Sequence, residues 1–324
     1  MRYAQLGPLG PVSRLTLGGG GLGRLWGETT AEEAIATTHA ALDAGIDLID
    51  TAPSYRDCEV VIGAAFEGAP PSHVRFTTKC QLGEPPRGEV AAHLETSLDA
   101  SLSAMRLERV DVFFLHSNIR PDDYRYARFD DRRTGFSTPW SMYVEEVVPA
   151  MERLQASGRI GAWGITGTGI PEGILAAIAH DPVPSMVQAV ANLMDSAGSM
   201  RAYAEPPRPR EIIAAAKARG LGVLGIRAVQ AGALTSSIDR ALKDNHPEVV
   251  DYRLAESYRA LCAELGEDPA VLAHRYALDM EGVDSVILGV KNRTELADCL
   301  RAEAAGPLPT DVRVRIDALG LAKP

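Results

Sequence analysis

Leu48-Ile49-Asp50-Thr51-Ala52-Pro53-Ser54-Tyr55 is the most informative segment of this chain of 324 residues, because its apolar start leads directly into ionisable side chains. Two later segments repeat the pattern. Ionisable residues thus follow three successive apolar runs that are typical of buried strands: Asp50 and Tyr55 after Ile46–Ile49, Lys79 after Val74–Thr78, and His116 after Val110–Leu115. In a parallel barrel the carboxyl ends of the strands converge on one rim. The sequence therefore predicts that these four side chains gather at the rim of a barrel enzyme.

Strand-like and helix-like segments alternate along the rest of the chain. Apolar runs occur at Leu15–Leu17, Ile46–Ile49, Val74–Thr78, Val110–Leu115, Ile160–Ile165, Ser185–Ala189, Gly222–Ile226 and Ser285–Leu288. Helical spacing occurs at Ala34–Ala44, Arg87–Met105, Tyr143–Ser157, Pro171–His180, Arg208–Arg219, Asp251–Leu265, Pro269–Met280 and Arg293–Ala304. Eight strands separated by helices predict an α/β fold, a (β/α)8 barrel. We expect Arg2–Arg14 to form a β-hairpin plug at one end, and residues 1–324 to form a single domain without a linker.

A glycine-rich segment offers an alternative fold. Gly18–Gly23 matches the Gly-x-Gly-x-x-Gly pattern of a dinucleotide-binding loop in a doubly wound sheet. Such a loop opens directly into a helix, whereas here the helical pattern starts only after Thr30, which forms a capping box with Glu33. We therefore favour a flexible loop after the first strand, in which the backbone of Gly20 lets a ligand approach.

Composition excludes several classes of partner. The net charge of −10 disfavours binding to nucleic acid or to an anionic membrane surface. No apolar run approaches the length of about 20 residues that a membrane span requires, and the amino terminus lacks a signal-peptide pattern. The cysteines show no metal-like spacing, which indicates reduced thiols: Cys58, Cys80, Cys262 and Cys299. We expect a cytoplasmic protein that needs no metal.

The four rim residues make chemical sense as a set. Each has a structural explanation when taken singly, such as a turn cap for Asp50. An unperturbed tyrosine has a pKa of about 10, which is high for proton donation at neutral pH. The Lys79 cation is expected to lower the pKa of Tyr55, and Asp50 to hold the lysine in place. His116 is suited to orient or polarise a carbonyl oxygen. The set describes an acid that protonates an alkoxide as hydride arrives.

This pattern resembles the aldo-keto reductase superfamily across nearly the whole chain. The resemblance lies in Leu48–Tyr55 with Glu59, Lys79 after Thr77-Thr78, Phe113–His116, Gly158–Ile165, Gln188 with Asn192, and Val286–Lys291. It implies a (β/α)8 barrel, NAD(P)-dependent carbonyl reduction, and catalytic roles for Asp50, Tyr55, Lys79 and His116. A monomer is the family-like default.

The resemblance also implies a nucleotide site. The expected cofactor-binding residues are Gly20, Asp50, Thr166, Gln188, Arg227, Gly289, Lys291, Arg293 and Asp298. Three positions depart from the family pattern: Gly167 replaces an asparagine, Arg227 replaces a stacking aromatic residue, and Asp298-Cys299 replaces an acid–asparagine pair. Arg227 is expected to lie on the nicotinamide or to reach the pyrophosphate, unless it is a solvated rim residue. Lys291 and Arg293 favour NADP through a 2′-phosphate, with NAD as the alternative.

The substrate is less well defined by the sequence. Trp26, Tyr55 and His116 are expected to line its pocket, together with the long segments Ser117–Ser141 and Ala228–Val250. The aromatic side chains of Ser117–Ser141 have a second interpretation, as packing on the barrel exterior. Three functions remain open: reduction of an aldehyde or ketone, oxidation of a sugar lactol by an aldose 1-dehydrogenase, and a cofactor-binding regulatory subunit with little turnover.

Overall fold

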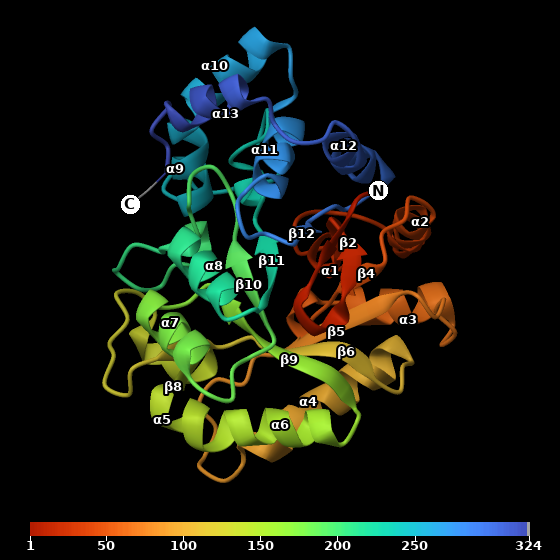
Figure 1. The fold of residues 1–324 in the computed structure, drawn as a ribbon, viewed down its shortest axis with the longest axis vertical. Coiled ribbons are helices and arrows are strands. Elements are labelled where there is room, and N and C mark those ends of the chain that lie inside the picture. Colours follow the sequence, from red (N-terminus) through yellow and green to blue (C-terminus); the bar gives the residue numbers. More distant parts are fainter. Residues whose placement is uncertain (323–324) are drawn as a thin grey trace.

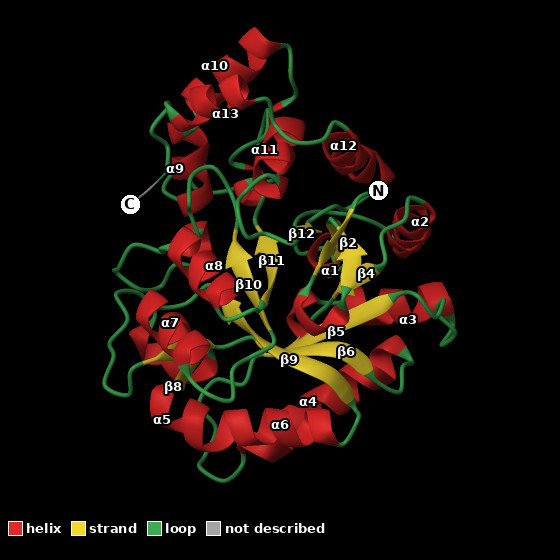
Figure 2. Ribbon diagram, in the orientation of Figure 1, coloured by secondary structure: helices red, strands yellow, loops and turns green. Residues whose placement is uncertain are grey.

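The predicted barrel is present in the computed structural model, which describes residues 1–322. Eight parallel strands close on themselves, in the order in which they follow one another along the chain. They are β3 (Leu15–Gly18), β4 (Leu48–Asp50), β5 (Arg75–Cys80), β6 (Val110–Leu115), β9 (Ile160–Gly167), β10 (Met186–Val190), β11 (Gly222–Ile226) and β12 (Ser285–Leu288). Figure 1 shows them at the centre, and Figure 2 shows the helices outside them. Each strand lies within two residues of its predicted position.

The helices that follow the strands cover the barrel. They are α2 (Ala31–Asp43), α3 (Cys58–Phe66), α4 (Val90–Met105), α6 (Val148–Ala156), α7 (Pro171–Ala179), α8 (Pro209–Ala218), α11 (Pro269–Leu278) and α12 (Arg293–Ala304). The predicted capping box is confirmed, since the Thr30 side chain accepts a hydrogen bond from the Glu33 backbone N–H and begins α2. The main apolar core lies between these helices and the strands.

Two helical predictions needed revision, and two helices were missed. The segment Asp251–Leu265 is not one helix: Ala255 separates α9 (Pro247–Leu254) from α10 (Glu256–Leu265). Tyr143–Ser157 begins with a π-helical turn over Tyr143–Val147 before α6. The sequence pattern did not predict α3 or the terminal helix α13 (Thr310–Asp317). Helices α9, α10 and α13 gather at one end of the molecule, at the top of Figure 1.

The amino-terminal hairpin closes one end of the barrel, as expected. Strand β1 (Tyr3–Gln5) pairs antiparallel with β2 (Pro11–Ser13). Between them Leu6 is fully buried, and it belongs to an apolar cluster formed by inward-facing strand residues: Val12, Leu48, Val112, Phe114, Ala162, Met186 and Leu224. Leu6 also approaches Gly222, the first residue of β11. The plug therefore seals the end at which the strands begin and leaves their carboxyl ends open.

The glycine-rich segment is not the flexible loop that we expected. Gly19–Leu22 forms a short buried helix, α1, directly after β3. A Cβ on Gly21 would overlap the carbonyl of Val290, and one on Gly23 would overlap the carbonyl of Tyr55. These glycines therefore permit close backbone packing between three loops of the rim, and the segment is rigid for that reason.

The long segment after β6 also has structure of its own. Strand β7 (Asn118–Arg120) pairs with β8 (Ser137–Pro139) in a two-stranded sheet. Its aromatic residues pack into a separate small cluster, which contains Tyr124, Tyr126, Phe136, Ile170, Ala202 and Tyr203. Tyr124 and Tyr126 therefore pack on the barrel exterior, whereas Phe129 is exposed; none of these aromatic side chains is among the described residues that line the main cavity. Among residues 1–322 no helix has the length and apolar character needed to cross a membrane.

Candidate active site

Asp50, Tyr55, Lys79 and His116 meet at the carboxyl ends of the strands. Asp50 is the last residue of β4, Lys79 lies near the end of β5, and His116 follows β6. Tyr55 ends a short 3₁₀ turn, Pro53–Tyr55, that follows β4. The Lys79 ammonium lies 4.6 Å from the centre of the Tyr55 ring, whose centre is 5.9 Å from that of His116. The structure thus brings the four predicted residues together.

The buried carboxylate of Asp50 organises the base of this site. Its Oδ2 accepts a hydrogen bond of 2.6 Å from Lys79 Nζ, which also donates to the carbonyl of Thr51 at 2.7 Å. Its Oδ1 accepts from Thr77 Oγ1 at 2.7 Å and from Gln188 Nε2 at 2.6 Å. Thr77 is the register partner of Asp50 in the neighbouring strand. Both oxygens are therefore engaged, and Lys79 has a fixed position.

Burial and charge set the protonation states at the rim. Burial raises the pKa of Tyr55 above its ordinary value, and the Lys79 cation opposes this shift without reversing it. Lys79 lowers the pKa of Tyr55 as expected, but burial is the larger effect, so the net shift in the pKa is upward. Burial disfavours the ammonium of Lys79, but Asp50 and Tyr55 outweigh it and raise the lysine pKa. Burial, assisted by Lys79, lowers the pKa of His116 to about 3. The site thus holds a neutral tyrosine, a lysine cation and a neutral imidazole near pH 7.

A second buried carboxylate supports the site from α3. Glu59 accepts hydrogen bonds from Thr78 Oγ1 at 2.6 Å and from Thr51 Oγ1 at 3.3 Å. Thr78 precedes Lys79 in β5, and Thr51 supplies the carbonyl that binds the ammonium. Glu59 therefore ties the two backbone segments that carry the catalytic candidates to the helix behind them.

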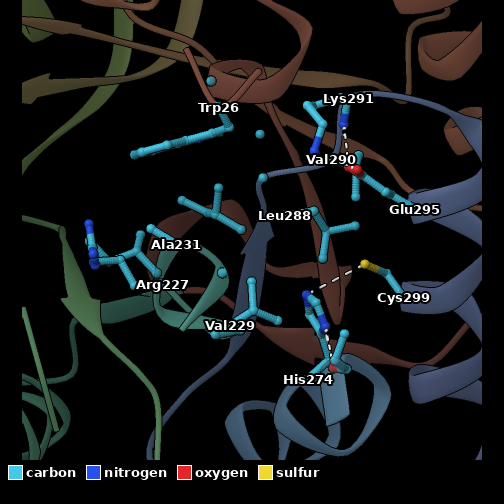
Figure 3. Close-up of a pocket in the computed structure, with 18 of the residues that line it drawn as sticks. Trp26, Arg227, Val229, Ala231, His274, Leu288, Val290, Lys291, Glu295 and Cys299 are labelled. Carbon is cyan, nitrogen blue, oxygen red and sulfur yellow. Dashed lines mark hydrogen bonds and ion pairs between the residues drawn. The ribbon is translucent and has the colours of Figure 1, made fainter. Parts of the chain in front are cut away.

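A cavity of about 370 Å³ opens from these residues along the rim. Tyr55, His116 and Gln188 line it, and so do Lys291, just before α12, and Cys299, within α12. Figure 3 shows the part of the cavity between Trp26 and His274. His274 Nε2 lies 3.5 Å from Cys299 Sγ, within hydrogen-bonding distance, and His274 Nδ1 lies 2.8 Å from the carbonyl oxygen of Ala270. The lining thus includes the ionisable groups at the ends of the strands and a hydrogen-bonded pair of His274 and Cys299 between α11 and α12.

Most residues predicted to bind a nucleotide line this cavity. They are Gly20, Asp50, Thr166, Gln188, Arg227, Gly289, Lys291 and Asp298. Arg293 does not: its exposed guanidinium is bound by Glu33, with Nη2 lying 2.8 Å from Oε2. Trp26 lines the cavity as expected, but it lies against Gly20 and Gly289, two residues assigned to the nucleotide.

Arg227 is buried and paired, which excludes the solvated rim residue considered above. Its side chain is 6% exposed, and Nη2 lies 2.6 Å from Glu248 Oε1. Nε donates to Gln230 Oε1 at 2.7 Å. The backbone of Arg227 has a φ of 61°, in the left-handed region. This conformation turns the chain sharply after β11 and places the guanidinium at the wall of the cavity.

The sequence did not identify several of the lining residues individually. Val229, Asp239 and Arg240 come from the segment Ala228–Val250, and His274 comes from α11. The length of that segment was the available signal, since long loops in compact domains are usually functional or disordered. No pattern of spacing indicated which of its polar residues face the cavity.

The cavity fits an extended ligand that carries both polar and apolar parts. At the section nearest Tyr55, Gln188 presents an amide and Thr166 a hydroxyl. Gly289 is exposed at the cavity wall, with the Trp26 ring close to it. His274 and Leu288 supply flat and apolar contacts farther along. A nicotinamide dinucleotide combines an amide, charged phosphates and an adenine ring, and these residues match that sequence of groups. The fold and the site together define a barrel oxidoreductase.

Comparison with known proteins identifies the family. The profile of the Aldo/keto reductase family matches residues 14–320, and the chain belongs to this family of oxidoreductases. It is 23% identical to an L-galactose dehydrogenase of Arabidopsis thaliana, over 90% of this chain and 84% of that protein. It is 25% identical to a probable voltage-gated potassium channel subunit beta of Oryza sativa, over 100% and 98% of the two chains. An aldo-keto reductase from Bacillus halodurans, solved in its holo form, superposes with a TM-score of 0.71 at 22% identity, over 100% and 97% of the chains. This superposition supports the fold.

Proposed function

We propose that this chain catalyses the NAD(P)-dependent reduction of an aldehyde or ketone to an alcohol, with the Tyr55 hydroxyl as proton donor. The observation that carries the proposal is the arrangement of Tyr55 beside a buried Lys79–Asp50 pair, in the lining of a cavity of about 370 Å³ that most of the residues expected to bind a nucleotide also line. Aldo-keto reductases in general use a nicotinamide nucleotide, which supplies the hydride when it is bound.

Tyr55 is suited to give its proton to an alkoxide. Its raised pKa keeps the hydroxyl protonated at neutral pH, yet far more acidic than an alcohol. The Lys79 cation, 4.6 Å from the ring centre, stabilises the tyrosinate that remains after transfer. Asp50 acts through Lys79 by holding the ammonium in place at 2.6 Å. The proton thus moves from Tyr55 Oη to the substrate oxygen, and the negative charge stays beside a fixed cation.

His116 is suited to orient the substrate oxygen rather than to exchange protons with it. Its pKa of about 3 keeps the ring neutral, so one ring nitrogen carries a proton and the other accepts. Nδ1 lies 3.5 Å from Ser54 Oγ. The ring stands edge-on to Tyr55, with the ring centres 5.9 Å apart, and this arrangement supports a role for both side chains in binding the same substrate oxygen. A neutral imidazole in this position polarises the carbonyl by a hydrogen bond.

The nucleotide is held, in this proposal, by the residues that line the cavity. Gln188 and Thr166 bind the nicotinamide amide, and Arg227 supplies positive charge at the wall next to it. The expectation of NADP relied on Lys291 and Arg293 as partners of a 2′-phosphate. Arg293 does not line the cavity and is bound by Glu33, and Lys291 is already paired with Asp239, so these two residues do not support NADP over NAD.

A second candidate is the reaction in the opposite direction, in which the same residues catalyse the oxidation of a sugar lactol. This candidate is favoured by a relative named L-galactose dehydrogenase, which is 23% identical over 90% of this chain. In that direction Tyr55 takes the proton from the substrate hydroxyl. The third candidate, a regulatory subunit, is suggested by the relative named as a channel subunit beta. The complete set Asp50, Tyr55, Lys79 and His116 argues for turnover instead.

One set of assays separates these candidates. Purified protein is mixed with reduced nucleotide and a panel of aldehydes and ketones, and then with oxidised nucleotide and a panel of aldoses, while nicotinamide absorbance is followed. Turnover with carbonyl compounds at the higher kcat/KM supports the leading proposal, and turnover with aldoses at the higher kcat/KM supports the lactol dehydrogenase. Nucleotide binding without turnover on either panel would leave the regulatory subunit.

A further inference from the structure

Lys291 is bound by two carboxylates of its own chain. Its Nζ lies 2.6 Å from Asp239 Oδ2 and 2.5 Å from Glu295 Oε1, and the side chain is 14% exposed. Asp239 reaches it from the segment after β11, while Glu295 lies in the first turn of α12. Figure 3 shows Lys291 and Glu295 together at the wall of the cavity. The cation at this place is therefore already neutralised.

Two backbone donors at the start of α12 are also taken by carboxylates, and a third is taken by the Asn292 side chain. The N–H of Lys291 donates to Glu295 Oε2 at 2.8 Å, and the N–H of Arg293 donates to Glu33 Oε1 at 3.0 Å. The side chain of Arg293 binds both oxygens of Glu33. The N–H of Glu295 donates to the Asn292 side chain at 2.9 Å. Hydrogen bonding to Arg293 lowers the pKa of Glu33 to about 2, so this carboxylate stays charged at neutral pH.

These contacts occupy the features that would otherwise bind a phosphate. A helix start attracts anions through free N–H groups and its dipole, and here Glu33 and Glu295 act as those anions. Two cations, Lys291 and Arg293, face three carboxylates, from Glu33, Asp239 and Glu295. A nearby third cation, Arg240, lies 3.5 Å from Asp239 and donates to the carbonyl of Ala231, so it is paired as well.

We infer that this chain selects NAD and rejects NADP, because Asp239 and Glu295 hold Lys291 and repel a 2′-phosphate in the cavity, while Glu33 holds Arg293 and a backbone N–H at the start of α12. The inference rests on the proposed function, since it concerns the nucleotide of that same cavity. A phosphate dianion that reaches Lys291 from the cavity must break ion pairs of 2.6 and 2.5 Å and approach two carboxylates. A ribose diol instead donates hydrogen bonds, and carboxylates accept such bonds in NAD sites. Glu295 and Asp239 line the cavity, where a ribose could reach them.

The first test is a binding measurement on the unmodified protein. NADH and NADPH are titrated separately, and binding is followed by calorimetry and by quenching of tryptophan fluorescence, for which Trp26 in the cavity wall is a reporter. NADH should bind at least about tenfold more tightly, a difference of about 1.4 kcal/mol. The ratio of the two dissociation constants should shrink as salt rises, since the Debye length falls from about 10 Å at 0.1 M to about 3 Å at 1 M. If the site attracted the 2′-phosphate instead, NADPH would bind more tightly than NADH at low salt, and this preference would weaken as salt rises.

The second test removes the repelling charges. The variant Glu33→Gln/Asp239→Asn/Glu295→Gln keeps the shapes of the side chains and should bind NADPH at least about tenfold more tightly than the unmodified protein. Its affinity for NADH should fall, because neutral amides replace the carboxylates of Asp239 and Glu295 that accept hydrogen bonds from the ribose. Each single substitution should move the NADPH affinity part of the way, which keeps the test available if the triple variant folds poorly. Asp131→Asn is the matched control, because it removes an exposed carboxylate that does not line the cavity.

The outcomes separate this inference from the function on which it rests. Equal or tighter binding of NADPH by the unmodified protein would overturn the inference and leave the proposed oxidoreductase intact. A triple variant with unchanged NADPH affinity would overturn the role of the three carboxylates. Failure of both nucleotides to bind would reject the proposed function, and the inference with it.

Discussion

Lys79 Nζ lies 2.6 Å from Asp50 Oδ2, in an ion pair from which solvent is excluded. The desolvation of two buried charges is costly, and their attraction offsets it only where further hydrogen bonds satisfy the remaining atoms. Here the carbonyl of Thr51, the hydroxyl of Thr77 and the amide of Gln188 supply them. The pair therefore keeps a positive charge at a fixed position beside the Tyr55 ring.

Replacing Tyr55 with Phe should remove most turnover while preserving the fold. The change deletes one hydroxyl, and a positioned proton donor contributes roughly 10²–10⁴-fold in rate. Nucleotide affinity should stay within about threefold, since the ring and its contact with His116 remain. Steady-state rates and nucleotide titration measure the two effects. Near-normal carbonyl reduction by the variant would move the role of acid to another group.

Breaking the buried pair should lower both activity and stability. Lys79→Met leaves the Asp50 carboxylate buried without its cation, and Asp50→Asn leaves the ammonium without its anion. Loss of one partner of a buried pair typically costs about 3–5 kcal/mol. Urea unfolding would measure the change in the free energy of unfolding for each single variant.

The double variant Asp50→Asn/Lys79→Met is the control for that experiment. It removes both charges, so its stability should exceed that of either single variant, while its turnover stays low because Tyr55 lacks the cation. Additive losses of stability in the double variant would contradict a direct pair. Normal turnover in Lys79→Met would reject the role of Lys79 as the support of Tyr55.

The sequence predicted the strands well because their apolar runs are short, continuous and separated by turns. Val110–Leu115, Gly222–Ile226 and Ser285–Leu288 match the observed strands residue for residue. In a parallel sheet covered by helices on the outside, both faces of a strand are buried, and composition alone marks the element. The four rim residues were found for the same reason: they are ionisable groups at the ends of such runs.

The sequence was less informative where the outcome depends on partners distant in the chain. Arg293 was assigned to a phosphate, but Glu33, 260 positions away, binds it. Gly19–Leu22 was taken for a loop, although packing against Val290 makes it a helix. The expected decrease in the pKa of Tyr55 considered its charged neighbour and omitted burial, which is the larger effect. Each error concerns a tertiary contact that no local pattern encodes.

The hairpin plug provides a prediction about stability that is independent of catalysis. Leu6→Ala should lower the free energy of unfolding by about 2–5 kcal/mol, because Leu6 is fully buried in the cluster that fills the closed end of the barrel. Leu9→Ala is a matched control in the same hairpin: Leu9 is only partly buried, and its effect should be smaller. Neither residue lines the cavity, so nucleotide affinity should not change. A stability equal to that of the unmodified protein would show that the plug is dispensable.

The last prediction concerns the pH dependence of the reaction in its two directions. Because the pKa of Tyr55 is raised above its ordinary value of about 10, the hydroxyl stays protonated throughout the neutral range. The kcat/KM for reduction, which consumes this proton, should therefore be level from pH 6 to about pH 9 and fall only above about pH 10. Oxidation needs Tyr55 to accept a proton, so its kcat/KM should rise with pH over the same range.

His116 is not expected to contribute an inflection to these pH profiles. With a pKa of about 3, its imidazole is neutral at every pH in this range and should add no inflection near 6.5. The variant His116→Gln should have a lower rate but a profile of the same shape. An inflection between pH 6 and 7 that disappears in His116→Gln would show that the imidazole titrates during catalysis. In that case His116 would exchange a proton with the substrate, and Tyr55 would not be the acid.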